Sequence, residues 1–429
     1  MKRFWGAAYS FFVIPLFWIA FQAIGLVNAK ARRAIRGRVT LFADLERQIA
    51  LLGPGPRVWF HSSSMGEFEQ AKPIIAELKR RHPGTLVVVS FFSPSGYEHS
   101  RTYRLADVIT YLPFDTRRNA RRFLDLVRPD AAVMVRYDIW PNHIWETHAR
   151  GIPVLIANAT MRMRTKRRLP IARSFHHSVY NDIDDILTVA ASDVEAFRLF
   201  SLDHPTLRAI GDTRYDQVTA RSAEARKRRI IPPAITAGKR VVVIGSSWHE
   251  DEEVVIPACL RLQSETGNVL VIVVPHEPTE EHIEELERDI AGKATSIRFS
   301  GLNEYAGENI IIVDSVGILL VLYALAHIAF VGGSFRQGIH NVLEAAVFGI
   351  PVLFGPRHRN SHEPIMLVEC GGGFVVENTA ELYRTLQNLL ADDGARQASG
   401  ERAAKFVESH TGATARFLEH LEGRLPKRL

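Results

Sequence analysis

A short loop around residue 64 combines residue types that could do acid–base chemistry. The apolar run Arg57–His61 leads into Ser62 to Glu67 (SSSMGE), where a helix is expected to begin. A glycine-containing loop between a strand and a helix is a common ligand site in doubly wound α/β folds. Glu67 would lie in the first helical turn, where the helix dipole favours its ionised form. Such a carboxylate could accept a proton from an attacking hydroxyl.

The same loop also has a purely structural interpretation. Ser64 and Glu67 fit the S-x-x-E pattern of a capping box, in which each side chain satisfies a free backbone N–H at the helix start. The spacing does not separate the two roles, and both stay open at this point.

Other polar loops in the first half could add to a site. Phe91–Gly96 could shape an acceptor pocket, and Val135–Asn142 places Asp138 beside aromatic residues, either as a site group or as a helix cap before Pro141. A basic run further on could meet phosphates or could be a solvated loop. It contains Arg162, Arg164, Lys166, Arg167 and Arg168.

The second half contains a more specific loop. The strand Ile328–Gly332 is followed by Gly333 to Ala346 (GSFRQGIHNVLEAA), in which glycines and Ser334 precede a helix start. Free backbone N–H groups there could hold a phosphate, and the acceptor-only carboxylate of Glu344 suits the two hydroxyls of a ribose. The loop is neither a Walker A motif nor a G-x-G-x-x-G fingerprint, which disfavours ATP hydrolysis and hydride transfer.

Two histidine-containing loops, Gly245–Glu250 and Val273–Glu277, should lie at the same edge of the second sheet. A single histidine is more often a structural hydrogen-bonding group than a functional one. No pair of histidines has the spacing of a metal site, so we predict no bound metal. Cys259 and Cys370 also lack a metal-ligand spacing, which is typical of free thiols in a reducing compartment.

Alternating strands and helices should position these loops. Predicted strands of the first half are Arg57–His61, Thr85–Phe91, Ala131–Val135, Val154–Asn158 and Asp185–Val189; those of the second are Arg240–Gly245, Val269–Pro275, Ile310–Val313, Ile328–Gly332 and Pro351–Phe354. Helical patterns such as Glu69–Arg81 follow several of them, which predicts parallel βαβ units.

We therefore predict an α/β protein with two Rossmann-like, doubly wound domains facing a cleft. The length of 429 residues suits two domains. The first should cover residues 40–218, and a basic, proline-containing linker residues 219–239. The second should cover residues 240–429 and include a C-terminal helix.

The N-terminus predicts a membrane anchor over residues 4–29. Phe4 to Ala29 carries no charge and is long enough to span a bilayer as a helix. A cleaved signal peptide is the alternative, but its apolar core would be shorter. Basic residues follow at once, so the rest of the chain should stay cytoplasmic, with this cluster against anionic headgroups. They are Lys30, Arg32, Arg33, Arg36 and Arg38.

Several blocks, in this order, make the chain resemble the Kdo (3-deoxy-D-manno-octulosonic acid) transferase family. They are His61–Gln70 (HSSSMGEFEQ), Tyr111–Asp115 (YLPFD), Trp140-Pro141-Asn142, Gly211–Asp216 (GDTRYD) and Gly332–Glu344. The similarity runs from the anchor through Val376.

The resemblance implies a GT-B fold and an inner-membrane anchor with the catalytic domains on the cytoplasmic face. It also implies inverting, metal-independent transfer of Kdo from CMP-Kdo to a lipid A precursor. The family's general base falls on Glu67, and its proposed transition-state stabilisers fall on Asp138 and Arg214. Expected donor-binding residues are Pro275, His276, Gly317, Ser334, Gly338, His340, Asn341, Val342, Leu343 and Glu344. Acceptor-side candidates are Ser64, Gly66 and Arg164.

The chain departs from the family pattern at four positions, namely Arg136, Thr160, His276 and Ile318. These departures affect the details of CMP contact and acceptor choice. The expected partners are CMP-Kdo, the lipid A precursor and inner-membrane lipids, with no cofactor and no nucleic acid. The rival functions are a GT-B transferase or epimerase that uses a UDP-sugar, and a non-catalytic, membrane-tethered lipid-binding protein.

Overall fold

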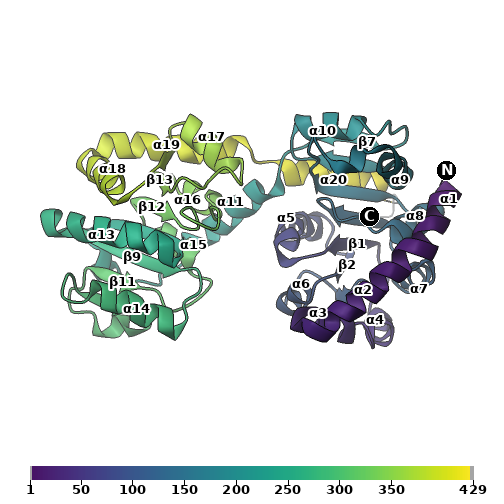
Figure 1. Ribbon diagram of the computed structural model, residues 1–429, viewed down its shortest axis with the longest axis horizontal. Coiled ribbons are helices and arrows are strands. Elements are labelled where there is room, and N and C mark those ends of the chain that lie inside the picture. The colour runs from purple at the N-terminus through teal and green to yellow at the C-terminus, as the bar shows by residue number, and fades with distance from the viewer. Residues whose placement is uncertain (1, 426–429) are drawn as a thin grey trace. The chain divides into compact units, whose positions relative to one another are not determined.

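The computed structural model describes residues 2–425. They divide into two compact units: residues 2–217 with residues 411–425, and residues 218–410. Figure 1 labels many of the helices and strands of both units. Residues 426–429, which the sequence analysis placed at the end of the second domain, lie outside the described residues.

The first unit is built on a parallel seven-stranded sheet in the order β3-β2-β1-β4-β5-β6-β7. The strands are β1 (Arg57–Ser62), β2 (Leu86–Phe91), β3 (Val108–Tyr111), β4 (Ala131–Val135), β5 (Val154–Ala159), β6 (Asp185–Thr188) and β7 (Thr206–Ala209). The strand order reverses between β1 and β4. Ligands of doubly wound folds bind outside the carboxyl ends of the strands at this point.

Helices cover both faces of this sheet. They are α4 (Leu41–Ala50), α5 (Met65–Arg81), α6 (Pro94–Ser100), α7 (Arg117–Val127), α8 (Pro141–Ala149), η2 (Lys166–Arg168), α9 (Pro170–Tyr180), α10 (Ala191–Arg198) and α11 (Thr213–Ala225). Successive side chains of a strand point to opposite faces. Trp59 accordingly packs into one hydrophobic core, while Val58 and Phe60 pack into the other.

The C-terminal helix α20 (Ala413–Arg424) belongs to the first unit, which corrects its predicted placement in the second domain. Figure 1 shows this yellow helix in the same unit as α5 and β1. Phe417, Leu418 and Leu421 are fully buried in the core that contains Val58 and Phe60. Arg424 Nε also donates to Asp185 Oδ2 at 2.7 Å. The chain therefore returns from the second unit to complete the first.

Because Phe417 is fully buried in that core, Phe417→Ala should destabilise the first unit. Truncating a buried phenylalanine typically costs about 3–5 kcal/mol. Thermal or denaturant unfolding should show the loss, and Glu419→Ala, on the exposed side of the same helix, is the control. Equal stability of the two variants would contradict the packing of α20 on the first unit.

The apolar N-terminal segment forms one helix from Lys2 to Val27, which by length and composition is long and apolar enough to cross a membrane. It consists of α1 (Lys2–Ala8), a π-helical turn η1 (Tyr9–Val13) and α2 (Ile14–Val27). One side of it packs against the first unit. Tyr9 and Ile14 enter the core, and the Phe17 ring stacks on Phe114 at 5.2 Å between ring centroids.

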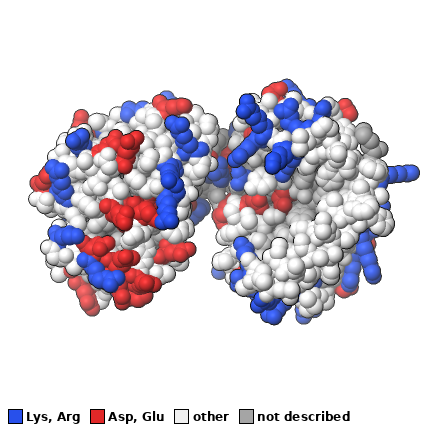
Figure 2. Space-filling model, viewed as in Figure 1, with Lys and Arg blue, Asp and Glu red and all other residues white. Residues whose placement is uncertain are grey.

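The outer side of this helix is exposed and apolar. Phe11 and Phe12 are each 76% exposed, and Leu26 is 78% exposed. Figure 2 shows a broad face of the first unit without charged residues over α1 and α2. The helix therefore offers apolar surface along its length while staying seated on the unit.

The basic segment after the apolar helix is itself helical, as α3 (Ala29–Arg36), and the side chain of Asn28 caps it by accepting from the Ala31 N–H at 3.0 Å. Arg38 departs from the expectation that it faces headgroups. Its guanidinium donates to the backbone carbonyls of Phe92 and Leu112, and burial lowers its pKa to about 10. Arg38 therefore fastens this segment to the sheet.

The second unit has its own parallel seven-stranded sheet in the order β10-β11-β9-β8-β12-β13-β14. Its strands are β8 (Arg240–Ser247), β9 (Val269–Pro275), β10 (Ser296–Arg298), β11 (Ile310–Ile312), β12 (Ile328–Val331), β13 (Val352–Phe354) and β14 (Gly373–Val375). Its order reverses between β8 and β12.

The helices of the second unit are α12 (Pro233–Thr236), α13 (His249–Thr266), α14 (Glu280–Ile290), η3 (Phe299–Glu304), α15 (Leu319–Tyr323), α16 (Leu343–Ala346), α17 (Glu363–Glu369), α18 (Thr379–Ala391) and α19 (Asp393–Ser409). The predicted linker, residues 219–239, is only partly irregular, because residues 219–225 form the end of α11 and α12 lies inside it.

Candidate active site

Two carboxylates meet at the reversal point of the first sheet. Glu67 is in the first turn of α5, directly after β1, and Asp138 follows β4. His61 lies between these elements, with its Nε2 atom 2.9 Å from Asp138 Oδ2. Ser63 donates a short hydrogen bond to the same carboxylate. The structure thus brings together two of the three predicted catalytic residues and adds a histidine and a serine.

The Glu67 carboxylate forms the capping box and also carries an altered pKa. Glu67 Oε2 accepts from the Ser64 backbone N–H at 3.0 Å, and the Glu67 N–H donates to Ser64 Oγ at 3.4 Å. Burial and then the negative charge of Asp138 raise the pKa of Glu67, although the Ser64 N–H and His61 oppose the rise. A carboxylate that is buried beside another negative charge binds protons more readily, as a general base must.

Asp138 is shifted in the opposite direction. Burial by itself would raise its pKa, but His61, Ser63 and Trp140 stabilise the charged form and hold its pKa below the ordinary value. Environments that separate the pKa values of neighbouring carboxylates typically give them different chemical roles. Asp138 is therefore suited to remain a fixed negative charge while Glu67 exchanges a proton.

Arg214, the third predicted catalytic residue, begins helix α11 and is held by Asp212. Its Nε donates to Asp212 Oδ2 at 2.9 Å. The neighbouring Thr213 Oγ donates to the Gln70 carbonyl at 2.7 Å, and Asn158 Nδ2 donates to Thr213 Oγ at 2.6 Å. The blocks that contain Gln70 and Arg214 therefore meet in the fold through these buried contacts.

The three acceptor-side candidates have different settings. Ser64 is the N-cap of α5, while Gly66 is exposed and an added Cβ there would meet nothing within 4 Å. Arg164 is exposed in the basic loop after β5. In the same loop Arg167 donates to the Tyr180 hydroxyl and Arg168 to the Met163 carbonyl. The loop is therefore partly structural, with Arg164 on its outer side.

A buried aspartate shapes the predicted donor loop of the second unit. Asp251, in the first turn of α13, accepts from the backbone N–H groups of Gly333 at 2.7 Å, Trp248 at 3.0 Å and Phe335 at 3.3 Å. Burial raises its pKa, and these three donors oppose the rise. The close approach also needs Gly332, because a Cβ there would lie 2.3 Å from the Ser246 carbonyl oxygen. The loop is thereby fixed at the reversal point of the second sheet.

Three aromatic rings form a stack beside this loop. The rings of His276 and His340 lie 4.4 Å apart, and the Trp248 ring lies 4.7 Å from His276. Trp248 Nε1 donates to His340 Nε2 at 2.9 Å. Burial and then His276 lower the pKa of His340 to about 4, so His340 is neutral at physiological pH. Of the predicted donor residues, His276 and His340 therefore lie in direct contact.

The remaining residues that were predicted to bind the sugar donor fall into two groups. Ser334 is fully buried, and its hydroxyl accepts from the Gly355 N–H at 2.7 Å and donates to the Val331 carbonyl, so its side chain has a structural role. Pro275, Val342 and Leu343 are also buried. Gly317 and Gly338 have positive φ angles of 82° and 110° and provide backbone turns.

Asn341 and Glu344 present polar groups at the start of α16. Asn341 Oδ1 accepts from the Leu343 N–H at 3.2 Å. The backbone N–H groups of Asn341 and Val342 donate to no acceptor within residues 2–425. Glu344 Oε1 lies 3.2 Å from Arg221 Nη1, and its side chain keeps 21% of its surface exposed. Two backbone N–H groups that can donate hydrogen bonds and one carboxylate therefore lie within four successive residues.

Strained backbone occurs at the ends of the site-forming strands. Arg136, Asn158 and Ser246 have φ angles of 65°, 52° and 53°, in the left-handed region that residues with a Cβ rarely adopt. Each directly follows or lies at the carboxyl end of β4, β5 or β8. Such backbone strain is found most often at functional sites. Here it lies at the carboxyl ends of β4, β5 and β8, where the candidate site loops begin.

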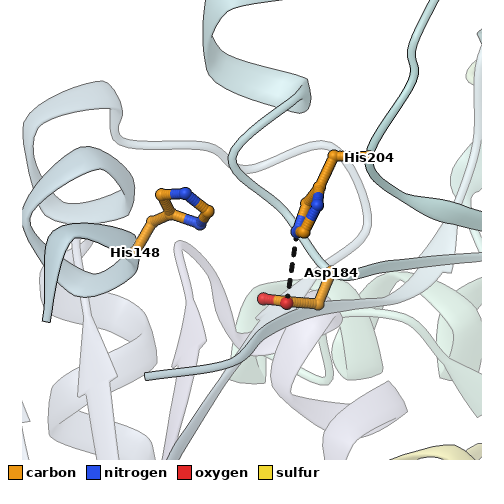
Figure 3. Close-up of side chains that lie close together, drawn as sticks. All are labelled: His148, Asp184 and His204. Carbon is orange, nitrogen blue, oxygen red and sulfur yellow. Dashed lines mark hydrogen bonds and ion pairs between the residues drawn. The ribbon is translucent and has the colours of Figure 1, made fainter. Parts of the chain in front are cut away.

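One cluster of the first unit could hold a cation, although the sequence predicted no metal. The ligand atoms of His148, Asp184 and His204 all lie within 4.8 Å of one another (Figure 3). Asp184 directly precedes β6 and His204 precedes β7, at the amino end of the sheet. The cluster therefore lies at the edge opposite to Glu67 and takes no part in that site.

His61, Trp140 and Asp251 contribute to the candidate sites but were not predicted from the sequence. The family blocks contain His61 and Trp140, but the contacts of His61 with Asp138 and Trp140 join segments that are far apart in the sequence. The signal for Asp251 was its position in the first turn of a helix after Gly245–Glu250, where a carboxylate can accept backbone N–H groups.

Comparisons with known proteins agree with this architecture. Residues 32–217 match the family model described as 3-deoxy-D-manno-octulosonic-acid transferase (kdotransferase). A 3-deoxy-D-manno-octulosonic acid transferase of Haemophilus influenzae is 28% identical over 417 residues, covering 94% of this chain and 95% of that protein. The crystal structures of UDP-GlcNAc 2-epimerase from Neisseria meningitidis and of MurG from Acinetobacter baumannii match with TM-scores of 0.58 and 0.53, at 15% and 12% identity. Each of these two matches covers 86% of this chain and 100% of the matched chain.

Two doubly wound parallel sheets, each with polar loops at its reversal point, and these structural neighbours define a protein of the GT-B fold class. The sequence relationship narrows the class further. The chain is similar over nearly its whole length to Kdo transferases, which are glycosyltransferases, and residues 32–217 match the model of that family.

Proposed function

We propose that this protein transfers Kdo from CMP-Kdo to the sugar of a lipid A precursor in a single inverting displacement. The observation that carries the proposal is the pair of Glu67 and Asp138 at the reversal point of the first sheet, with their pKa values shifted apart. Glu67 takes the proton of the acceptor hydroxyl. The hydroxyl oxygen then bonds to the anomeric carbon of Kdo as the bond from that carbon to the CMP phosphate breaks, and CMP leaves with the electron pair.

The proposal places the donor on the second unit. The free N–H groups of Asn341 and Val342 would bind the phosphate of CMP, and the Glu344 carboxylate would accept hydrogen bonds from the ribose hydroxyls. Because His340 is neutral at physiological pH, backbone dipoles near the phosphate would carry more of its stabilisation than this imidazole. Arg214 would add a positive charge as negative charge develops on the leaving phosphate.

The acceptor would bind to the first unit, and this unit would also contact the membrane. The exposed apolar side of α1 and α2 would lie in the inner membrane, next to an apolar groove that Trp5, Val13, Leu169, Ile171 and Phe175 line. Exposed Arg164 lies in the loop directly before Leu169, where it could meet a phosphate of the lipid. Apolar surface with adjacent basic residues is typical of proteins that bind anionic bilayers. The positive charges after the anchor favour the cytoplasmic face.

A turnover assay tests the whole proposal. CMP-Kdo and the tetraacyl lipid A precursor should give a Kdo-bearing lipid and free CMP, and CMP should displace a labelled donor more strongly than UDP does. Stronger displacement by UDP would favour a UDP-sugar enzyme of the same fold. Lipid binding without turnover would favour a non-catalytic lipid-binding protein.

The pH dependence of turnover should report on Glu67. The base must be ionised to act, and the pKa of Glu67 is raised, so activity should fall on the acid side at a higher pH than the ordinary glutamate pKa predicts. Asp138→Asn removes a negative charge that contributes to this rise. The acid limb of the residual activity should therefore move to lower pH in that variant, and an unmoved limb would contradict the coupling of the two carboxylates.

A further inference from the structure

The N-terminal helix is joined to the first unit by a buried polar contact that membrane attachment alone does not require. Tyr9, in the π-helical turn, is 9% exposed, and its hydroxyl donates to Asp115 Oδ2 at 2.9 Å. Ser10 Oγ donates to Asn142 Oδ1 at 3.2 Å. A π-helical turn within an α-helix is frequently found at functional sites.

Asp115 is fully buried and links this helix to the start of α8. Its carboxylate accepts from the backbone N–H groups of Asn142 at 3.2 Å and His143 at 3.1 Å, and lies 2.6 Å from His143 Nδ1. These N–H groups belong to the first turn of α8, which has no cap from Trp140, its own N-cap residue. Asp115 therefore caps α8 from a distant part of the chain, with Tyr9 as its fourth donor.

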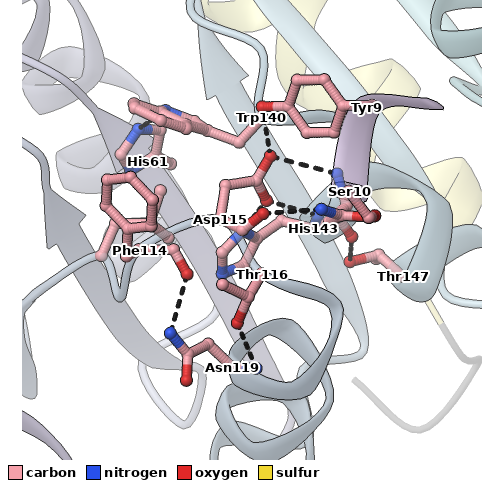
Figure 4. Close-up of polar contacts among 12 residues, drawn as sticks. Tyr9, Ser10, His61, Phe114, Asp115, Thr116, Asn119, Trp140, His143 and Thr147 are labelled. Atoms are coloured by element: carbon pink, nitrogen blue, oxygen red, sulfur yellow. Dashed lines mark hydrogen bonds and ion pairs between the residues drawn. The ribbon is translucent and has the colours of Figure 1, made fainter. Parts of the chain in front are cut away.

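The segment that Asp115 fixes contains the site aspartate. Trp140 immediately precedes α8, and its Nε1 lies 2.9 Å from His61 Nε2, which in turn lies 2.9 Å from Asp138 Oδ2. The Trp140 ring packs on the Phe92 ring, with 4.5 Å between the ring centroids. The ring of Phe17, which belongs to the N-terminal helix, has its centroid 6.5 Å from that of Trp140. The position of the N-terminal helix and the position of Asp138 therefore depend on one set of contacts, of which Figure 4 shows those of Asp115, His143, Trp140 and His61.

We propose that Tyr9, acting through Asp115, is a positioning residue that holds the start of α8, and with it Trp140 and Asp138, in the geometry the reaction needs. The N-terminal helix is then part of the catalytic scaffold as well as an apolar anchor. This inference rests on the proposed function for its kinetic consequence and on the contacts above for its structural one. Small misplacements of catalytic groups by distant changes lower rates strongly.

Tyr9→Phe tests the inference because it keeps the ring and removes only the hydroxyl. In turnover assays with CMP-Kdo and the lipid precursor, kcat should fall about tenfold with little change in KM for the donor. Ser174→Ala is the matched control, because it removes the hydrogen bond from Trp5 to the same unit (2.9 Å) without touching Asp115. An equal loss in both variants would overturn the inference, because it would show that any loosening of the helix has the same effect.

A double variant separates positioning from general destabilisation. If Tyr9 acts through Asp138, adding Tyr9→Phe to Asp138→Asn should lower kcat by less than about twofold, because the two changes affect one chain of contacts. A further tenfold loss in the double variant would show that Tyr9 acts elsewhere and would overturn the inference.

A measurement without turnover keeps this test independent of the proposed function. Fluorotryptophan labelling of the six tryptophans, with Trp140→Phe to assign one signal, allows ¹⁹F NMR to follow Trp140. Tyr9→Phe should shift the Trp140 signal, whereas Ser174→Ala should shift that of Trp5. An unmoved Trp140 signal in Tyr9→Phe would overturn the inference, even if the wild type transfers Kdo. Absence of turnover in the wild type, with the Trp140 signal shifted by Tyr9→Phe, would refute only the proposed function.

Discussion

Replacing Glu67 with glutamine should lower turnover by about 10²–10⁴-fold, the usual contribution of a general base. The amide cannot take the proton of the acceptor hydroxyl. Glutamine can still occupy this position of a capping box, so α5 should keep its start and the variant should fold. Initial rates with CMP-Kdo and the lipid precursor, together with CMP binding by calorimetry, measure the two effects separately. CMP affinity should stay within about twofold of wild type, because Glu67 belongs to the first unit and the assigned CMP contacts to the second.

Glu69 provides a matched control two residues further along the same helix. Its carboxylate pairs with Lys72 and accepts from Gln217 Nε2 at 2.6 Å, and it has no assigned part in the reaction. Glu69→Gln should retain most of the wild-type rate. Normal turnover in Glu67→Gln, or a similar loss in both variants, would rule out Glu67 as the base.

Glu344→Ala should weaken CMP binding by about 10–100-fold. The carboxylate is assigned to the ribose hydroxyls, and hydrogen bonds to a charged group contribute about 1.5–3 kcal/mol each. Its side chain is partly exposed and lies in the first turn of α16, next to the free N–H groups of Asn341 and Val342. Calorimetric titration of the full chain with CMP measures the change directly.

Two further titrations make the Glu344 result specific. Deoxy-CMP, which lacks one ribose hydroxyl, should bind more weakly than CMP to the wild type but about equally to Glu344→Ala. Glu369→Gln, an exposed glutamate at the end of α17, is the control and should bind CMP normally. Undiminished CMP affinity in Glu344→Ala would show that the ribose is bound elsewhere.

The central strands of both sheets could be predicted from the sequence because they are buried on both faces. Runs such as Val269–Pro275 are continuously apolar, and every residue of this strand is buried. The edge strands β3, β7, β10 and β14 were missed. Thr206–Ala209, for example, is largely exposed and carries no apolar run. This exposed edge strand gains its regularity from its neighbour, and its own residues do not encode it.

The residues of the candidate site could be predicted from the sequence better than the contacts between them. Glu67 and Asp138 follow strands that were recognised, so their loops could be assigned to one edge of the sheet. The roles of His61 and Trp140 depend on packing between β1 and the start of α8, which no local pattern reveals. Arg38 was assigned to the membrane surface because a basic cluster attracts anionic headgroups, yet its guanidinium donates to backbone carbonyls of the first unit.

The return of the chain to the first unit could not be predicted from local sequence. Helix α20 has an ordinary amphipathic pattern that fits packing on either sheet. Only the match between Phe417, Leu418 and Leu421 and the core around Phe60 decides which sheet it covers. The sequence therefore predicts the existence of this helix but not its partner.

This return also constrains the order of events during synthesis. The ribosome releases the apolar N-terminal helix before the second unit and the residues of α20 only after the whole of the second unit. The part of one face of the first sheet that Phe417, Leu418 and Leu421 cover consequently stays exposed until α20 has been made, while residues 218–410 can already fold. The nascent protein should therefore need protection of that face by a chaperone or by the bilayer, and premature termination before residue 411 should leave an aggregation-prone chain.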